Sequence, residues 1–99
     1  MNQLPVILNP LAEADLKTGH AWCELRRAGQ GADFLLCVEE VLERIGRQPE
    51  WYGREFGELR VAPLRRHQYA VAYRTDAAQV TVVAVYHLGS NPRAWQLRA

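Results

Sequence analysis

Apolar and polar residues follow two different periods along the chain. Between Phe34 and Ile45 the apolar positions recur every three or four residues, and charged residues occupy the opposite face. This spacing predicts an amphipathic helix from Phe34 that ends at Gln48-Pro49, because the residue before a proline avoids helical geometry.

An earlier helix is predicted to begin at Asn9-Pro10, where an N-cap residue precedes a proline in the first helical position. Small and apolar residues keep helical spacing from there to about Arg27. Gly29 and Gly31 follow and are expected to end this helix. The two helical segments therefore form a predicted helical hairpin.

The remaining apolar runs predict β-strands. A short run at 5–8 precedes the first helix, and after a loop rich in glycine and aromatic residues at 51–57 the period changes from 3.6 to 2. Strands are predicted at 59–62, with 64–67 as a continuation beyond Pro63, at 69–73 and at 80–86. Asn91-Pro92 repeats the cap signal before a short helix that ends near Leu97.

This order, β-α-α-β-β-β with a short C-terminal helix, predicts the α+β class. Helices grouped ahead of strands favour an N-terminal strand and a helical hairpin packed on a mostly antiparallel sheet of about four strands. The other face of the sheet would be partly open. The length of 99 residues suits a single domain, 1–99.

Charge modifies this picture because it is unevenly distributed. The net charge is +1, but residues 1–53 hold five basic and eight acidic residues, whereas residues 54–99 hold seven arginines and three acids. The basic half is either a face for an anionic partner or ordinary solvated surface. Cys23 and Cys37 fall in helical segments and are expected to be reduced thiols of a cytoplasmic protein, since no signal segment or membrane span is visible.

Several strings stand in a characteristic order. They are Pro10–Leu16 followed by Trp22, Phe34–Pro49, Leu64-Arg65-Arg66-His67-Gln68-Tyr69, Val71–Arg74, Val83–His87 and Asn91–Trp95. Together they resemble the ParE/RelE superfamily of toxins from type II toxin–antitoxin systems, and ParE more closely. Two strings depart from the family pattern, because His67-Gln68 stands where relatives have Phe-Pro and 88–91 where they have Gly-Arg-Arg-Asp.

The resemblance implies one of three functions. ParE-like relatives inhibit DNA gyrase by binding it, RelE-like relatives cut messenger RNA on the ribosome, and a homologue inactivated by its changed loop at 88–91 would act as an interaction module. The gyrase hypothesis is favoured, because a near-neutral chain with one lysine is poorly suited to work inside ribosomal RNA. The resemblance also implies a cognate antitoxin, whose acidic C-terminal segment folds across the hairpin and the sheet.

The ribonuclease hypothesis assigns specific roles. His87 would act as acid or base, while Arg65 and Arg74 would stabilise charge on the phosphate. In the alternative interpretation His87 is a hydrogen-bonded strand-end residue and the arginines are solvated. Tyr69, Tyr73 or Tyr86 would stack on a base. Tyr69 and Tyr73 should share one strand face, and in the alternative interpretation they pack in the core.

The resemblance assigns residues to two partner surfaces. The target-binding set is Arg65, Arg66, Tyr69, Arg74, His87, Arg93 and Trp95, and the antitoxin-binding set is Trp22, Leu35, Val38 and Arg60. Trp95 is also expected to pin the terminal helix. No metal or cofactor is expected, because the sequence shows no metal-ligand cluster, glycine-rich phosphate loop or Ser/His/Asp arrangement.

Overall fold

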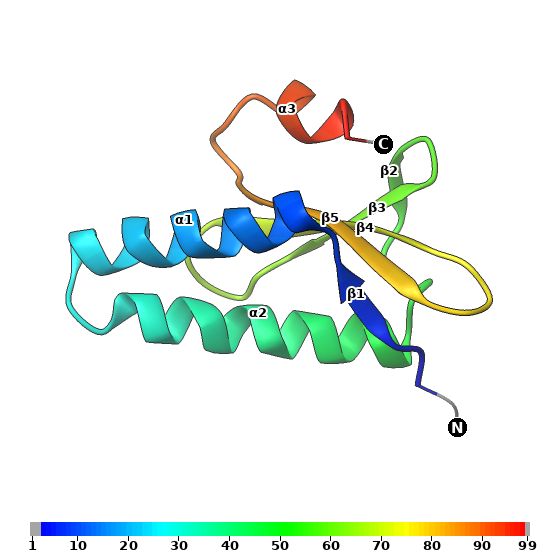
Figure 1. The fold of residues 1–99 in the computed structure, drawn as a ribbon, viewed down its shortest axis with the longest axis horizontal. Coiled ribbons are helices and arrows are strands. Elements are labelled where there is room, and N and C mark those ends of the chain that lie inside the picture. Colours follow the sequence, from blue (N-terminus) through cyan, green and yellow to red (C-terminus); the bar gives the residue numbers. More distant parts are fainter. Residues whose placement is uncertain (1–2, 99) are drawn as a thin grey trace.

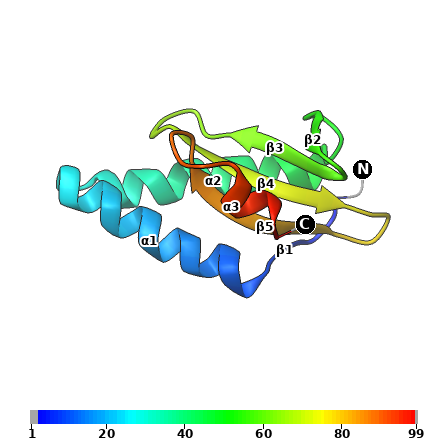
Figure 2. The same cartoon turned by 90° about the horizontal axis from the view of Figure 1, so that it is seen from above.

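A five-stranded sheet lies between a helical hairpin on one face and a short C-terminal helix on the other (Figure 1 and Figure 2). The computed structural model describes residues 3–98. The elements are β1 (Val6–Leu8), α1 (Pro10–Arg26), α2 (Gln30–Arg47), β2 (Arg54–Phe56), β3 (Leu59–Pro63), β4 (Tyr69–Thr75), β5 (Val80–His87) and α3 (Arg93–Gln96). The strand order is β1-β5-β4-β3-β2, with β1 parallel to β5 and the other neighbours antiparallel. The predicted α+β class and its mostly antiparallel sheet are confirmed.

Helix α1 keeps its predicted bounds to within a residue, whereas α2 ends as predicted but begins at Gln30, before the predicted start at Phe34. The Asn9 side chain accepts a hydrogen bond from the Ala12 N–H at 2.9 Å and caps α1, as its cap-and-proline signal predicts. The Glu24 carboxylate reaches from α1 to the start of α2 and accepts from the N–H groups of Gly29 and Gly31 at 3.0 Å. These bonds lower the pKa of Glu24, because they favour its ionised form.

Gly31 has a different role from the predicted one. Gly29, with a φ of 91°, makes the turn, but Gly31 lies inside α2, which begins at Gln30. A Cβ atom at Gly31 would stand 2.7 Å from Nε2 of His20 on α1. Gly31 therefore permits close approach of the two helices and does not break the helical structure.

The sheet has one more strand than predicted. Residues 54–56, placed by the sequence in an aromatic loop, form edge strand β2, with Arg54 opposite Arg60 and Phe56 opposite Leu59. Every residue of β2 is exposed, so the segment lacks the alternation that identifies a half-buried strand. The predicted continuation at 64–67 is also wrong, because β3 ends at Pro63.

The sheet buries side chains on both faces. Tyr73, Phe34 and Ile45 are fully buried in the core under the hairpin. On the other face Trp95 joins Ala72 and other residues in a smaller cluster. Helix α3 therefore covers part of the face that was expected to be partly open, and Val61 and Tyr86 there are only partly buried.

A β-bulge in β5 decides which of its residues face the hairpin. Ala72 of β4 pairs with Ala84 and the next residue, Tyr73, with Val82, so Val83 is an extra residue in the ladder. As a result Val82 and Val85 both pack in the core under the hairpin, although three positions separate them.

Polar side chains complete the hydrogen bonds of this bulge. The Val85 N–H donates to Oδ2 of Asp15 on α1 at 2.9 Å. Arg98, after α3, donates to the same oxygen at 2.6 Å and to the carbonyl of Val83 at 3.1 Å. We refer to Asp15 and Arg98 as the bulge clamp, which joins α1, β5 and the C-terminal tail.

Candidate functional site

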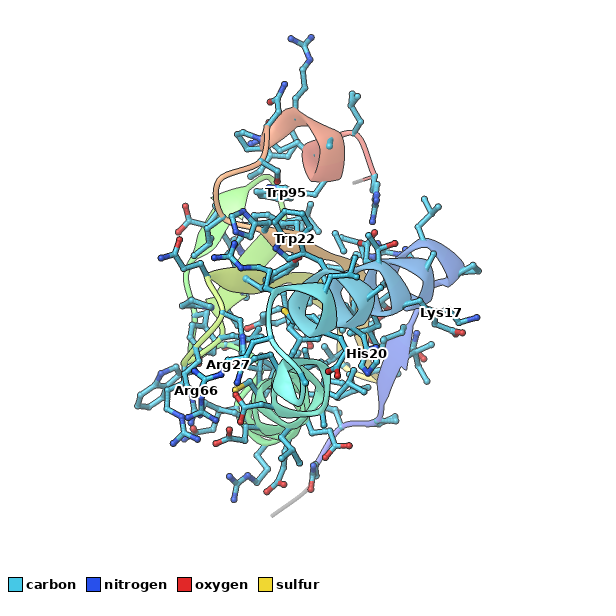
Figure 3. The ribbon with its side chains drawn as sticks, turned by 90° about the vertical axis from the view of Figure 1, so that its left-hand side faces the viewer. Lys17, His20, Trp22, Arg27, Arg66 and Trp95 are labelled. Atoms are coloured by element: carbon cyan, nitrogen blue, oxygen red, sulfur yellow. The ribbon has the colours of Figure 1, made fainter. Side chains whose placement is uncertain are left out.

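A cleft of about 470 Å³ opens where the hairpin turn meets the β3–β4 connection and the end of β5. It is lined by Trp22, Cys23, Arg26, Gln30, His67, Gln68 and His87. Figure 3 faces this end of the molecule and shows Trp22 above α1, with Arg66 beside α2. We call this feature the hairpin cleft.

His87 closes β5 and lines the hairpin cleft. Its Nδ1 accepts a hydrogen bond from the Gly89 N–H at 3.0 Å, so the neutral ring carries its proton on Nε2. The ring packs edge-on against Tyr69, its partner across the β4–β5 ladder, with centroids 5.1 Å apart. His87 is thus a hydrogen-bonded strand-end residue that keeps one N–H donor outside that bond.

His67 and Gln68 enter the cleft from an unusual turn. Their φ angles are 77° and 52°, a left-handed region that costs a residue other than glycine about 1–3 kcal/mol. His67 Nε2 lies 2.7 Å from Oδ2 of Asp33, and the Gln68 carbonyl accepts from the Leu88 N–H at 2.8 Å. These two bonds hold the strained turn in place.

Arg65 and Arg66 pair with acids on α2. The Arg66 guanidinium donates to both oxygens of Asp33, at 2.8 and 3.0 Å, and Arg65 donates to Glu40 at 3.0 Å. Arg66 and His67 lower the pKa of Asp33 to about 2. Two arginines of the C-terminal half are therefore paired, at the protein surface, with acids of the N-terminal half.

Arg74 lies far from His87. Tyr69 pairs with His87 at one end of the β4–β5 ladder, whereas Arg74 pairs with Thr81 toward the other end. Five strand residues span about 17 Å at about 3.3 Å each. The structure therefore does not gather His87, Arg65 and Arg74 into one catalytic group.

The predicted target-binding residues near the C-terminus lie on the opposite side of the sheet. Trp95 is 4% exposed, stacks on Tyr86 with centroids 5.2 Å apart and meets Phe56 edge-on at 6.5 Å. It pins α3 to the sheet, as predicted, and leaves little of its ring for a partner. Arg93 is exposed on α3.

Tyr69 and Tyr73 both pack in the core under the hairpin, in line with the shared strand face expected for them. Tyr73 is fully buried, and its hydroxyl donates to the Pro49 carbonyl at 2.8 Å. Burial raises the pKa of Tyr73 to about 12. The core interpretation therefore describes both tyrosines.

The antitoxin-binding candidates divide by exposure. Trp22 is 48% exposed and carries the Arg26 guanidinium 5.8 Å from its ring centroid, and Leu35 is partly buried. Val38 is 2% exposed in the core, and Arg60 donates to the Tyr52 carbonyl at 2.6 Å. Trp22 and Leu35 are the two of this set that offer apolar surface to a partner.

Sequence reasoning missed the residues that complete the hairpin cleft. Arg26 and Gln30 belong to no motif, and Asp33, which anchors the turn, precedes its partner by more than thirty positions. The sequence marks Gln68 only by its departure from the family string, and this departure is its one signal of a special role.

Asp33, Cys37 and His67 form a group that sequence reasoning did not single out. Their potential metal-ligand atoms lie within 4.8 Å of one another. Arg66 already binds both oxygens of Asp33, so a cation there would have to displace a guanidinium. Cys23 and Cys37 are both free, buried thiols.

The fold matches that of a solved toxin–antitoxin structure. The chromosomal ParDE toxin–antitoxin system from P. aeruginosa aligns with a TM-score of 0.76, covering 87% of this chain and 97% of that one at 13% sequence identity. At this identity the likeness concerns the fold. The architecture is thus that of a small α+β domain of the ParDE type.

Sequence comparison identifies the family more closely. Residues 6–92 match the model of the ParE toxin of type II toxin–antitoxin systems, parDE. The chain is also 36% identical over 61 residues to Toxin ParE2 of Mycobacterium tuberculosis, in strains CDC 1551 / Oshkosh and ATCC 25618 / H37Rv. That match covers 62% of this chain and 58% of the relatives, so the chain spans less than two thirds of their length. The chain belongs to the ParE toxin family of type II toxin–antitoxin systems.

Within residues 3–98, neither the hairpin helices nor α3 is long and apolar enough to cross a membrane.

Proposed function

We propose that this toxin inhibits DNA gyrase by binding it in the cytoplasm and that a cognate antitoxin neutralises it. The observation that supports this proposal is the separation of His87 from Arg74 along the β4–β5 ladder. Phosphoryl transfer needs an acid, a base and positive charge around one phosphate. Binding to another protein needs only a complementary surface.

The alternative, cleavage of messenger RNA on the ribosome, has less support. Arg65, one of the two cations proposed for the phosphate, pairs with Glu40, and Arg66 of the target-binding set pairs with Asp33. A net charge of +1 also provides little general attraction to RNA.

The second alternative, an inactive homologue, rests on the altered loop at 88–91. This loop is ordered by local bonds, because the Ser90 hydroxyl donates to the His87 carbonyl at 2.6 Å and the Gly89 N–H donates to the His87 ring. Leu88 at its start is 50% exposed. The loop thus has a defined shape and offers an exposed apolar side chain for a contact with a partner protein.

The outer side of α1 supports an antitoxin contact. Leu11, Trp22 and Leu25 are 55%, 48% and 85% exposed and stand at helical spacing, so they share one side of the helix. Exposed apolar residues that gather on one face favour a protein partner. An amphipathic antitoxin segment would cover this stripe, and its acidic residues would meet Arg26.

The proposed target is tested with purified toxin in a gyrase supercoiling assay. We expect supercoiling to be inhibited, and addition of the antitoxin encoded beside the gene to restore it. Unchanged supercoiling at saturating toxin would contradict the gyrase proposal. Cleaved messenger RNA after induction of the toxin would favour the ribonuclease alternative, whereas growth without arrest would favour the inactive homologue.

The proposed antitoxin surface is tested separately by calorimetry with the same antitoxin. Trp22→Ser should weaken binding by about tenfold or more, because exposed tryptophans often dominate interface energies. Leu36→Ser on α2 is the matched control, since Leu36 is 58% exposed and lies outside the α1 stripe. Equal affinity of wild type and Trp22→Ser would exclude this surface.

A further inference from the structure

The hairpin cleft is lined by hydrogen-bond donors. Arg26 supplies a guanidinium, Gln30 and Gln68 supply side-chain amides, and the neutral His87 ring keeps its Nε2–H. Among the described residues, none of those lining the cleft is an acid. The acid that His67 contacts, Asp33, is bound on both oxygens by Arg66. A concave surface of this composition suits an anion.

We propose that the hairpin cleft binds a phosphate-class oxyanion, an activity that does not depend on the gyrase proposal. Residues that carry donors, on α1, α2, the β3–β4 turn and the end of β5, line one cavity, which suits a tetrahedral group with several oxygens. Arg26 provides the formal charge, and its planar group forms paired bonds to phosphate. The volume of about 470 Å³ leaves room for more than the phosphate itself.

The walls of the cleft are preorganised by aromatic packing. His67 packs edge-on against Phe34 with centroids 6.1 Å apart, Phe34 against Tyr69 at 4.9 Å, and Tyr69 against His87 at 5.1 Å. Phe34 is fully buried and Tyr69 nearly so. Both histidines are therefore fixed by the core, and little side-chain entropy would be lost when a ligand binds.

The strained turn is an independent reason to assign a ligand to this cleft. His67 and Gln68 both have positive φ, although the chain elsewhere places glycine at positive φ, as at Gly29 and Gly57. Glycines at 67 and 68 would relieve the strain but would remove both side chains from the cleft. Strained backbone of this kind is concentrated at functional sites.

Phosphate binding is tested by titrating the purified, isotopically labelled chain with inorganic phosphate and following its NMR spectrum. We expect the Trp22 indole N–H and the Gln68 side-chain amide to shift. The indole N–H signals of Trp51 and Trp95, which lie outside the cleft, should not move. Absence of cleft shifts at about 10 mM phosphate would overturn the proposal, since binding weaker than that is not specific.

Arg26→Gln should reduce phosphate affinity by about tenfold, because a hydrogen bond to a charged group is lost. Lys17→Gln is the matched control, because it removes one positive charge from the same helix. Figure 3 shows Lys17 projecting away from Trp22. An equal loss of phosphate affinity in the two variants would mean that phosphate is attracted only by the net charge of the protein, and would overturn the proposal.

Gln68→Gly separates binding from folding. The glycine keeps the main-chain carbonyl that accepts from the Leu88 N–H. Glycine also adopts a positive φ without steric strain, so the melting temperature should not fall. Phosphate affinity should nevertheless decrease, because an amide donor is removed. Unchanged affinity would count against the role of this turn in the site.

The source of the phosphate is distinguished by adding adenosine monophosphate and a short DNA oligonucleotide as further titrants. If the cleft binds a nucleotide, the monophosphate should bind more tightly than phosphate and quench Trp22, because a base stacks on an exposed indole. If it binds free phosphate, the two affinities should be equal. If the oligonucleotide binds without shifting the signals of Trp22 and Gln68, the cleft is not a site for the phosphates of nucleic acids.

Discussion

At the scale of single residues, glycine positions show how closely the two hairpin helices approach. Gly19 of α1 is buried, and a Cβ atom there would stand 2.6 Å from Cζ of Phe34 on α2. Phe34 in turn contacts Tyr69 of the sheet. One missing methyl group therefore sets the distance between the hairpin and the aromatic residues beneath the cleft.

Gly19→Ala should destabilise the protein by about 2 kcal/mol despite the better helix propensity of alanine, because the core cannot accommodate the added carbon. The free energy of unfolding in urea measures this change. Thr18→Ala, at an exposed neighbouring position, is the control and should alter stability by only a few tenths of a kcal/mol. A Gly19→Ala protein as stable as wild type would show that Phe34 can move aside.

Asp33 also acts at the residue scale, through pH. Its pKa is lowered from 3.8 to about 2 by Arg66 and His67, so its contribution to stability is present above pH 3.8 and is lost as the pH falls toward 2. Asp33→Asn should be less stable than wild type at pH 6, and the difference should disappear near pH 2. Urea unfolding at pH 6, 4 and 2 measures it. A constant difference over this range would exclude ionisation of Asp33 as its cause.

At the scale of elements, the bulge clamp ties the terminal tail to the centre of the sheet. Asp15 accepts from the backbone of β5 and from Arg98, while Trp95 holds α3 on the sheet. The clamp satisfies the main-chain groups that the bulge frees from the β4–β5 ladder. Three elements distant in sequence are therefore joined by one carboxylate.

Asp15→Ala should cost about 2 kcal/mol, because it leaves the Val85 N–H and the Arg98 guanidinium without this partner. Amide hydrogen exchange should increase at Val85 and in α3 as well. Glu13→Ala is the matched control, since this exposed acid on α1 contributes only about 0.5 kcal/mol through the helix dipole. If both variants lose equal stability, the clamp does not secure the tail.

The sequence predicted the elements whose signal is local. The apolar stripe of α2, the cap at Asn9 and the β-branched run of β5 are each readable in a single segment, and the structure contains them. Strand β2 was missed because three exposed residues become a strand only through pairing with β3. The bulge at Val83 likewise depends on Asp15 and Arg98, which no local pattern connects to it.

The candidate site was less predictable than the fold. His87 was identified, but His67 and Gln68 reach the same cleft through backbone angles that residue type does not indicate. Arg65 and Arg74 looked comparable in sequence, yet one pairs with Glu40 and the other lies at the far end of the ladder. Tertiary ion pairs and strand register determine these differences.

At the scale of the whole molecule, charge is balanced between the two halves. Asp15, Asp33 and Glu40 in the N-terminal half pair with arginines of the C-terminal half. The basic half therefore does not present a continuous cationic surface. A protein of this kind is suited to contacts with few phosphates.

We therefore expect weak binding to non-specific RNA at physiological salt. A single phosphate contact would give a shallow slope of about −0.7 to −0.9 in a plot of log affinity against log salt concentration. Filter binding at 50 and 200 mM salt would measure this slope. A steep slope would mean that many ions are released on binding. This result would contradict the balanced charge and would favour the ribosome as the target. A Lys17→Gln variant should leave a shallow slope nearly unchanged.

The turn at 67–68 also limits what can be transferred from other members of the family. The family string that this segment resembles has Phe-Pro here, but proline fixes φ near −65°, whereas Gln68 has a φ of 52°. The backbone here therefore follows a different path from any chain with the family proline. Replacing residues 67–68 with the family consensus, usually a route to a more stable protein, would in this case dismantle the loop.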